Sequence, residues 1–179
     1  MKTLHNNKLP ILYDNLFTSV EQIIRGGYAG ASVVVPHVCN NVGVFGGGFT
    51  AGISKYYPIV KDNYHLIGNK ARMGYVQYVE VMKDPAYNHK LIFANMIAQN
   101  GTISKTNYRP LNYGALVSCM MSVASYINNS FDKENNVQIH APKFGSGLAG
   151  GNWSFIEELI KDIWSYNPVF IYDLKKPKT

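Results

Sequence analysis

Two glycine-rich turns contain the residues of this chain that are best suited to chemistry. Residues 43–48 (Gly-Val-Phe-Gly-Gly-Gly) follow the apolar run 32–39, and residues 145–151 (Gly-Ser-Gly-Leu-Ala-Gly-Gly) follow the run 137–142. A helix-like segment comes after each turn. A helix N-terminus exposes unpaired backbone N–H groups at the positive end of its dipole, and glycine lets an anion approach them closely. Two such turns indicate a ligand with two phosphates, or a diphosphate held from both sides.

The composition limits the class of protein. The chain has 179 residues, of which 46% are hydrophobic and 16% charged, which is typical of one globular domain spanning 1–179. The 17 Lys and Arg against 11 Asp and Glu give a net charge of +6. Basic residues gather only at Lys70/Arg72 and in the tail 175–179. We therefore expect a preference for polyanionic ligands rather than dedicated nucleic-acid binding.

The cysteines and the apolar runs suggest a compartment. Cys39 and Cys119 are the only cysteines and lack metal-binding spacing, so reduced thiols in a cytoplasmic protein are expected. There is no apolar leader segment at the N-terminus and no apolar run long enough to span a bilayer. We expect a soluble protein without a membrane partner.

Hydrophobic periodicity predicts alternating strands and helices. Strands are expected at 9–13, 32–39, 75–82, 90–98, 137–142 and 169–174, and helices at 17–25, 49–57, 59–67, 111–127 and 153–166. Phe155 is expected on the buried face of the last helix, beside Ile156 and Ile160. The turn 84–88 joins two adjacent strands. This order predicts an α/β fold whose mixed sheet has helices on both faces, with polar loops at 100–107 and 128–136.

Five separated segments resemble the macro domain family. Residues 37–49 (His-Val-Cys-Asn-Asn-Val-Gly-Val-Phe-Gly-Gly-Gly-Phe) are similar to its first loop, in particular to the subgroup of ADP-ribose 1''-phosphate phosphatases. Residues 142–153 are similar to its second loop, and 93–99, 113–116 and 170–174 to other segments. The resemblance spans about residues 9–174. It implies a three-layer α/β/α macro domain with a mixed central sheet that binds ADP-ribose, as a monomer.

The resemblance assigns roles to residues of both loops. Asn40 would hydrogen-bond the distal ribose and act as the catalytic residue, although its amide could instead cap the loop backbone. Asn41 would accompany it, or be merely solvated. The remaining ligand contacts would come from Gly43, Phe45, Gly46, Gly47 and Gly48 of the first loop, and from Gly145, Ser146, Gly147, Leu148, Ala149 and Gly150 of the second. For Phe45, core packing is the alternative.

Adenine recognition would fall to Asp14 or Asn15 together with Tyr172. The family usually has an aspartate that accepts a hydrogen bond from the adenine amino group, and Asn15 aligns there with Asp14 one residue before it. Asp14 could equally be a residue at a helix N-terminus. Tyr172 would form a wall for the adenine, with a core tyrosine as the alternative.

The resemblance also bears on the reaction. Related terminal ADP-ribose glycohydrolases use a lysine and an aspartate where this chain has Gln99 and Ala149, which argues against a covalent lysine route. A phosphatase route needs a water, a base and donors for the phosphoryl charge. No acidic residue lies in either turn, so neither a metal nor a cofactor is expected. Strand alternation would point His37 and Asn40 to opposite faces of the sheet, so His37 is expected as a buried, hydrogen-bonded core residue. The same two interpretations, core residue or site residue, apply to His140.

These features predict hydrolysis of ADP-ribose conjugates at the 1'' position, with ADP-ribose 1''-phosphate as the first substrate. O-acetyl-ADP-ribose and ADP-ribosylated macromolecules, nucleic acid included, are the alternative substrates. The competing hypothesis is a module that reads or sequesters ADP-ribose-like nucleotides without turnover.

Overall fold

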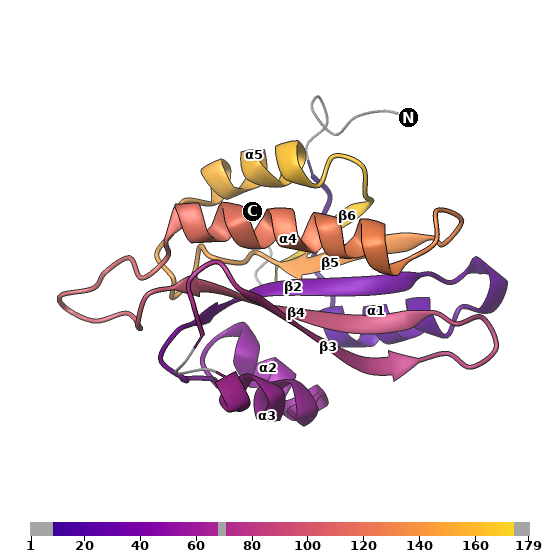
Figure 1. The fold of residues 1–179 in the computed structure, drawn as a ribbon, viewed down its shortest axis with the longest axis horizontal. Helices are drawn as coiled ribbons and strands as arrows, with labels where there is room; N and C mark the ends of the chain where they lie inside the picture. The colour runs from indigo at the N-terminus through magenta and orange to yellow at the C-terminus, as the bar shows by residue number, and fades with distance from the viewer. Residues whose placement is uncertain (1–8, 68–70, 174–179) are drawn as a thin grey trace.

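A six-stranded mixed sheet forms the middle of the protein (Figure 1). The computed structural model describes residues 9–67 and 71–173. The strand order is β1-β6-β5-β2-β4-β3, and all neighbours are parallel except the antiparallel pair β3 and β4. The strands are β1 (Ile11–Leu12), β2 (Ser32–Asn40), β3 (Val76–Lys83), β4 (Lys90–Gln99), β5 (Val137–Pro142) and β6 (Val169–Tyr172).

Helices cover both faces of this sheet, which confirms the predicted three-layer α/β/α architecture. α4 (Tyr113–Ser130) and α5 (Trp153–Ile163) lie on one face. On the other lie α1 (Leu16–Ile24), α2 (Phe49–Tyr56) and α3 (Pro58–Ile67). A single 3-10 turn, η2 (Gly27–Ala29), links α1 to β2.

The central strand β2 is buried on both faces, as its valine run predicts. Val34 packs into the core beneath α4 and α5, whereas Val33 and Val35 pack toward α1, α2 and α3. All three are completely buried. Because both faces are covered, nearly the whole strand is apolar. Apart from Ser32 at its start, its polar residues are His37 and Asn40, which come near its carboxyl end.

The helix predicted at 111–127 differs from α4 at both ends. α4 begins at Tyr113 because the side chain of Asn112 accepts a hydrogen bond from the Ala115 N–H as an N-cap. It continues to Ser130, so the loop after it is shorter than predicted. Leu111, expected in the helix, forms an isolated bridge with Gln99 instead. Leu174 and the basic tail 175–179 lie outside the described residues, as does Lys70.

The prediction for Phe155 is wrong. It is 46% exposed and packs edge-to-face against Tyr113, with ring centroids 4.9 Å apart. α5 ends at Ile163, and Trp164, just beyond it, is fully buried. The Trp164 indole donates a hydrogen bond of 2.9 Å to the Met120 carbonyl. That bond fixes the rotation of α5 and turns Phe155 away from the core.

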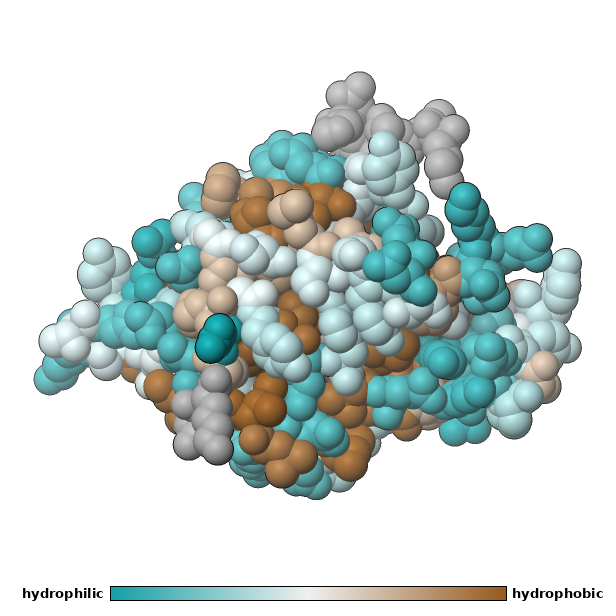
Figure 2. All heavy atoms as spheres, viewed as in Figure 1, coloured by the Kyte–Doolittle hydropathy of each residue, from teal (hydrophilic) through white to brown (hydrophobic). Residues whose placement is uncertain are grey.

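The surface and the thiols complete the description of the fold. Figure 2 shows apolar side chains gathered over the region of α3, where Ile59 and Leu66 are exposed. Cys39 and Cys119 are both free and buried, and burial raises the pKa of each thiol, that of Cys119 to about 12. Within residues 9–67 and 71–173, no helix is long and apolar enough to cross a membrane.

Candidate functional site

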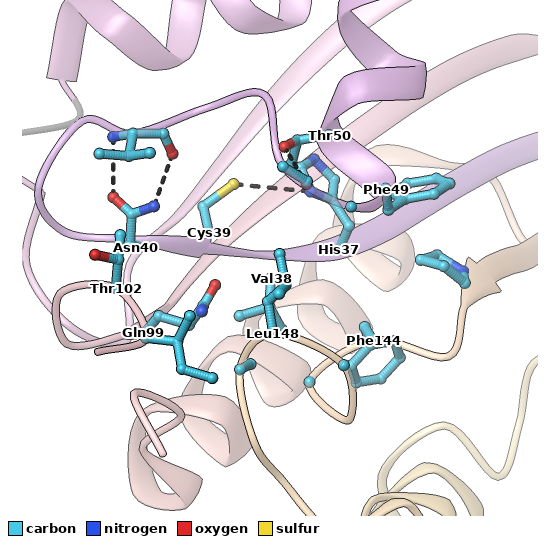
Figure 3. Close-up of a pocket in the computed structure, with 18 of the residues that line it drawn as sticks. His37, Val38, Cys39, Asn40, Phe49, Thr50, Gln99, Thr102, Phe144 and Leu148 are labelled. Atoms are coloured by element: carbon cyan, nitrogen blue, oxygen red, sulfur yellow. Dashed lines mark hydrogen bonds between the residues drawn. The ribbon is translucent and has the colours of Figure 1, made fainter. Parts of the chain in front are cut away.

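A cavity of about 310 Å³ lies where three parallel strands end (Figure 3). Asn40 ends β2, Gln99 ends β4 and Pro142 ends β5, and all three line the cavity. In open α/β sheets, ligands bind at this carboxyl edge. The other lining residues are His37, Val38, Cys39, Val44, Gly47, Gly48, Phe49, Thr50, Thr102, Ile103, Lys143, Phe144, Gly145, Gly147, Leu148 and Ala149.

The first glycine turn leads directly into α2. Gly48 is the N-cap of α2 and has a φ of 57°, in the left-handed region that favours glycine. The Thr50 hydroxyl accepts from the Gly46 N–H at 2.9 Å and donates to the Gly47 carbonyl at 2.8 Å. Among the described residues, nothing accepts a hydrogen bond from the N–H groups of Gly47 and Gly48. These two donors at a helix N-terminus suit an anion.

Asn40 holds the first turn in shape. Its Oδ1 accepts from the Val42 and Val44 N–H groups, each at 3.1 Å, and from the Tyr64 hydroxyl at 2.8 Å. Its Nδ2 donates to the Val44 carbonyl at 2.7 Å. Asn40 therefore does cap the loop backbone, and only the second hydrogen on Nδ2 remains for a ligand. Its contact with the distal ribose stays a prediction.

The second glycine turn presents further donors across the cavity. The Gly150 N–H donates to the Gly147 carbonyl at 3.0 Å, and the Gly151 N–H to the Gly145 carbonyl at 2.8 Å. These bonds fold the turn on itself. In the part of the chain that the structure describes, the N–H groups of residues 146–149 have no such acceptor.

Leu148 brings the two turns together. Its Cδ1 would lie 3.3 Å from a Cβ placed on Gly47 and 3.7 Å from one placed on Gly48. The Leu148 side chain is 56% exposed, so it lies over the cavity as a partial roof (Figure 3). The backbone donors of both turns therefore lie around one narrow space.

A third wall comes from loop 100–110, which includes the predicted polar loop 100–107 and contributes Thr102 and Ile103 to the lining. Asn41 ties this loop to the first turn, since its Oδ1 accepts from the Gly101 N–H at 2.8 Å and its Nδ2 donates to Asn100 Oδ1 at 3.1 Å. The Leu111 N–H donates to the Ala149 carbonyl at 3.1 Å, which ties the loop's end to the second turn. No local sequence signal could reveal these long-range contacts.

Asp14, Asn15 and Tyr172 lie outside the cavity lining. Asn15 is the N-cap of α1, where its Oδ1 accepts from the Phe17 and Thr18 N–H groups. Its amide is therefore occupied, which leaves Asp14 as the candidate for adenine. Burial, and to a lesser degree the charge of Asp14, raises the pKa of Tyr172. Tyr172 ends β6.

Several other predicted contacts also lie outside the lining. Phe45 is buried and packs against Tyr64, with ring centroids 5.1 Å apart, so it has the core position that was the alternative for it. The side chains of Asn41 and Ser146 bond other loop residues: Asn41 bonds Asn100, and the Ser146 Oγ donates to the Lys143 carbonyl at 3.1 Å. The cavity lining also lacks Gly43, Gly46 and Gly150. Ligand contacts by these residues stay predictions.

The prediction that His37 and Asn40 face opposite sides of the sheet is wrong. The ladder between β2 and β4 shifts register between Cys39 and Asn40, so strict alternation fails at that step. Both side chains line the cavity, and both contact residues of the α2–α3 layer: His37 lies beside Phe45, and Asn40 bonds Tyr64.

His37 is nonetheless a buried, hydrogen-bonded residue, as expected. Its Nε2 lies 2.6 Å from Asn95 Oδ1, and Nδ1 lies 3.7 Å from Cys39 Sγ. Because Asn95 Nδ2 donates to Gln77, its Oδ1 must accept, so His37 Nε2 carries the proton. Nδ1 then accepts from the Cys39 thiol. Neither ring nitrogen is free to take a proton from water.

His140 is fixed in the same way, outside the cavity lining. Its Nε2 lies 2.9 Å from Gln138 Oε1, and its Nδ1 lies 2.9 Å from the Tyr172 hydroxyl. The pair fits an Nε2–H that donates to Gln138 and an Nδ1 that accepts from Tyr172. His140 thereby orients the hydroxyl of Tyr172.

These two buried histidines should make the protein less stable in weak acid. Burial lowers the pKa of His37 and of His140 to about 4, from an ordinary value of 6.5. The unfolded chain therefore takes up these protons at a higher pH than the folded one. The free energy of unfolding should fall by about 1 kcal/mol per histidine between pH 7 and pH 5.5. Urea titrations at the two pH values measure this difference, which His140→Gln should roughly halve. An unchanged free energy of unfolding would contradict it.

The charged groups of the cavity lining favour an anionic ligand. Among the described residues that line the cavity there is no carboxylate, and Lys143 is the one permanent cation. The Lys143 ammonium lies 3.1 Å from Asp173 and 5.6 Å from the centre of the Trp153 ring. Within the described ranges, no group of three or more His, Cys, Asp or Glu side chains could hold a metal ion. The site can therefore bind anions mainly through neutral backbone and amide donors.

Comparisons with known proteins support the same fold as the sequence motifs. No family model matches the chain. A 17.5 kDa protein from the tk–vs intergenic region of Enterobacteria phage T4 is 25% identical over 142 residues, 78% of this chain and 84% of that protein. A solved protein from Bacteroides thetaiotaomicron is 25% identical with a TM-score of 0.72, covering 93% of this chain and all of that one.

This chain is also similar in structure to solved macrodomain proteins. A macrodomain protein from Streptomyces coelicolor is 27% identical with a TM-score of 0.66, covering 93% of this chain and 99% of that one. Thermosipho africanus DarTG, solved in complex with ADP-ribose, is 17% identical with a TM-score of 0.69, covering 97% of this chain and 44% of that one. The glycine turns, the sheet order and these neighbours together show that this chain has the macrodomain fold.

Proposed function

We propose that the protein binds ADP-ribose in this cavity and hydrolyses its conjugates at the 1'' carbon, with ADP-ribose 1''-phosphate as the first substrate. The observation that carries the proposal is the pair of glycine turns whose unpaired N–H groups meet around one space. A diphosphate fits between them, because each phosphate can take donors from one turn. The ADP-ribose bound by the structurally similar DarTG supports this choice of ligand.

We propose one direction for the ligand. The adenine would lie toward β6, which Tyr172 ends, and the diphosphate between Gly47–Gly48 and the second turn. The distal ribose would then lie toward β4, at the ends of β2 and β4 where Asn40 and Gln99 line the cavity.

In the proposed reaction a water attacks the phosphorus atom of the 1''-phosphate. A new P–O bond forms, the bond from phosphorus to the C1'' oxygen breaks, and a proton passes to that oxygen, giving ADP-ribose and inorganic phosphate. Since Oδ1 of Asn40 already accepts three hydrogen bonds, Asn40 contributes only its remaining Nδ2 hydrogen, as a donor to the ribose or phosphate. O-acetyl-ADP-ribose and ADP-ribosylated macromolecules are the other conjugates to test.

The second candidate function is a reader that holds ADP-ribose without turnover. It is favoured by the ionisable groups of the lining: no carboxylate is present, and both ring nitrogens of His37 are occupied. A site without a free base would orient an attacking water but not deprotonate it.

One experiment separates the two candidates. We expect calorimetry to show saturable binding of ADP-ribose, and AMP to bind about tenfold or more weakly because it reaches only one set of donors. Release of phosphate from ADP-ribose 1''-phosphate, followed in parallel, reports turnover. Binding with no release above that of a buffer blank favours the reader. If ADP-ribose does not bind, both candidates fail.

A further inference from the structure

The two ends of the cavity differ in chemistry. One end is lined by the rings of Phe49, Phe144 and His37 (Figure 3). The other end is lined by Asn40, Gln99 and Thr102, whose side chains are uncharged and polar (Figure 3). If the adenine lies on the β6 side, the polar end is the one that meets the group attached to the distal sugar.

At the polar end, the Gln99 amide and the Thr102 hydroxyl are available to a ligand in full, whereas Asn40 keeps only one Nδ2 hydrogen for it. Among residues 9–67 and 71–173, no hydrogen bond involves the Gln99 amide or the Thr102 hydroxyl, although the Thr102 carbonyl accepts from Asn107. The Asn40 amide, by contrast, makes four hydrogen bonds to the loop and Tyr64. Figure 3 shows Gln99 projecting into the cavity between Asn40 and Leu148.

The backbone that carries both side chains is held firmly. The Gln99 carbonyl accepts from the Asn41 N–H at 3.0 Å, and the Gly101 N–H donates to Asn41 Oδ1 at 2.8 Å. Asn107 Nδ2 donates to the carbonyls of Asn100 and Thr102, at 2.9 and 3.1 Å. The backbone positions from which these two side chains project are therefore set before a ligand binds.

Resting on the proposed binding of ADP-ribose, we infer that Gln99, with Thr102 beside it, determines which group is accepted on the 1'' carbon, and that this group is a phosphate monoester. A phosphate has acceptor oxygens for the two amide hydrogens and the hydroxyl. No carboxylate of the lining opposes its charge. A bare 1'' hydroxyl needs fewer of these donors, so their removal should affect ADP-ribose much less.

The test compares two ligands on four variants. ADP-ribose and ADP-ribose 1''-phosphate are titrated by calorimetry at 4 °C, with liberated phosphate assayed at the end of each run. Gln99→Leu should weaken the 1''-phosphate about tenfold and ADP-ribose by less than about threefold. Gln99→Glu, nearly the same shape but negatively charged, should weaken the 1''-phosphate about 100-fold. Thr102→Val should weaken it less than Gln99→Leu. Thr106→Val, in the same loop but outside the cavity lining, is the matched control and should change neither ligand.

The outcomes are distinct. If Gln99→Glu leaves the ratio of the two affinities unchanged, the inference is overturned while ADP-ribose binding stands. If both ligands weaken equally, Gln99 supports the site in general and does not select the 1'' group, which also overturns it. If the wild-type protein binds neither ligand, the proposed function itself has failed.

Discussion

Replacing Gly150 with alanine should destabilise the protein by about 2–4 kcal/mol and abolish ADP-ribose binding. Gly150 has a φ of 73°, and a Cβ there would lie 2.5 Å from the Tyr108 carbonyl oxygen and 3.0 Å from Arg109 Cα. Both are backbone atoms of loop 100–110, so no side-chain rotation can relieve the overlap. The second turn would have to separate from that loop, which disrupts two walls of the cavity together.

Gly147→Ala is the matched control for this change of stability. Gly147 belongs to the same turn, its φ is not in the left-handed region, and a Cβ there would meet nothing within 4 Å. The free energy of unfolding of the Gly147→Ala variant should stay within about 0.5 kcal/mol of the wild-type value. Urea denaturation of both variants, with ADP-ribose titrations, measures the contrast. Equal stability of Gly150→Ala and Gly147→Ala would show that the turn and the loop are not fixed against each other.

Asn40→Ala should lower the free energy of unfolding by about 2–3 kcal/mol and lose ADP-ribose binding with it. The substitution removes the acceptor of the Val42 and Val44 N–H groups and the donor to the Val44 carbonyl. The first turn then keeps the Thr50 bonds to Gly46 and Gly47 but loses the bonds at Val42 and Val44, so its glycines are held less firmly beside the cavity.

Tyr64→Phe distinguishes the two roles of Asn40. This variant removes the bonds from the Tyr64 hydroxyl to Asn40 but keeps the bonds from Asn40 to the loop, so we expect a loss of about 1 kcal/mol and nearly normal binding. Unfolding curves and calorimetry on both variants provide the measurement. If Asn40→Ala is as stable as wild type and loses only binding, Asn40 acts on the ligand rather than on the loop.

Much of the fold could be predicted because its strands carry a strong local signal. The strand at 137–142 was predicted with the limits that β5 has, and the valine run of β2 indicated burial on both faces. The turn at 84–88 correctly predicted the antiparallel pair β3 and β4. Phe155 was misplaced because the rotation of α5 is set by Trp164, whose partner, Met120, is distant in the sequence.

The site could be predicted only in part, for the same reason. The glycine turns are visible in the sequence, and seven of their residues do line the cavity: Val44, Gly47, Gly48, Gly145, Gly147, Leu148 and Ala149. The register shift at Asn40 has no sequence signature, so its side of the sheet was predicted wrongly. The wall formed by loop 100–110 depends on contacts of Asn41 and Ala149 with residues far along the chain.

The two edges of the sheet differ in how much regular backbone they expose. A long, regular edge strand invites pairing with a second copy of a chain. Here β3 forms one edge, and its pairing with β4 is interrupted between Glu80 and Met82, while an ion pair of 3.4 Å joins Lys90 to Glu80. The other edge, β1, is only two residues long in the described chain. Neither edge offers a straight row of free backbone groups, so aggregation by strand addition is disfavoured.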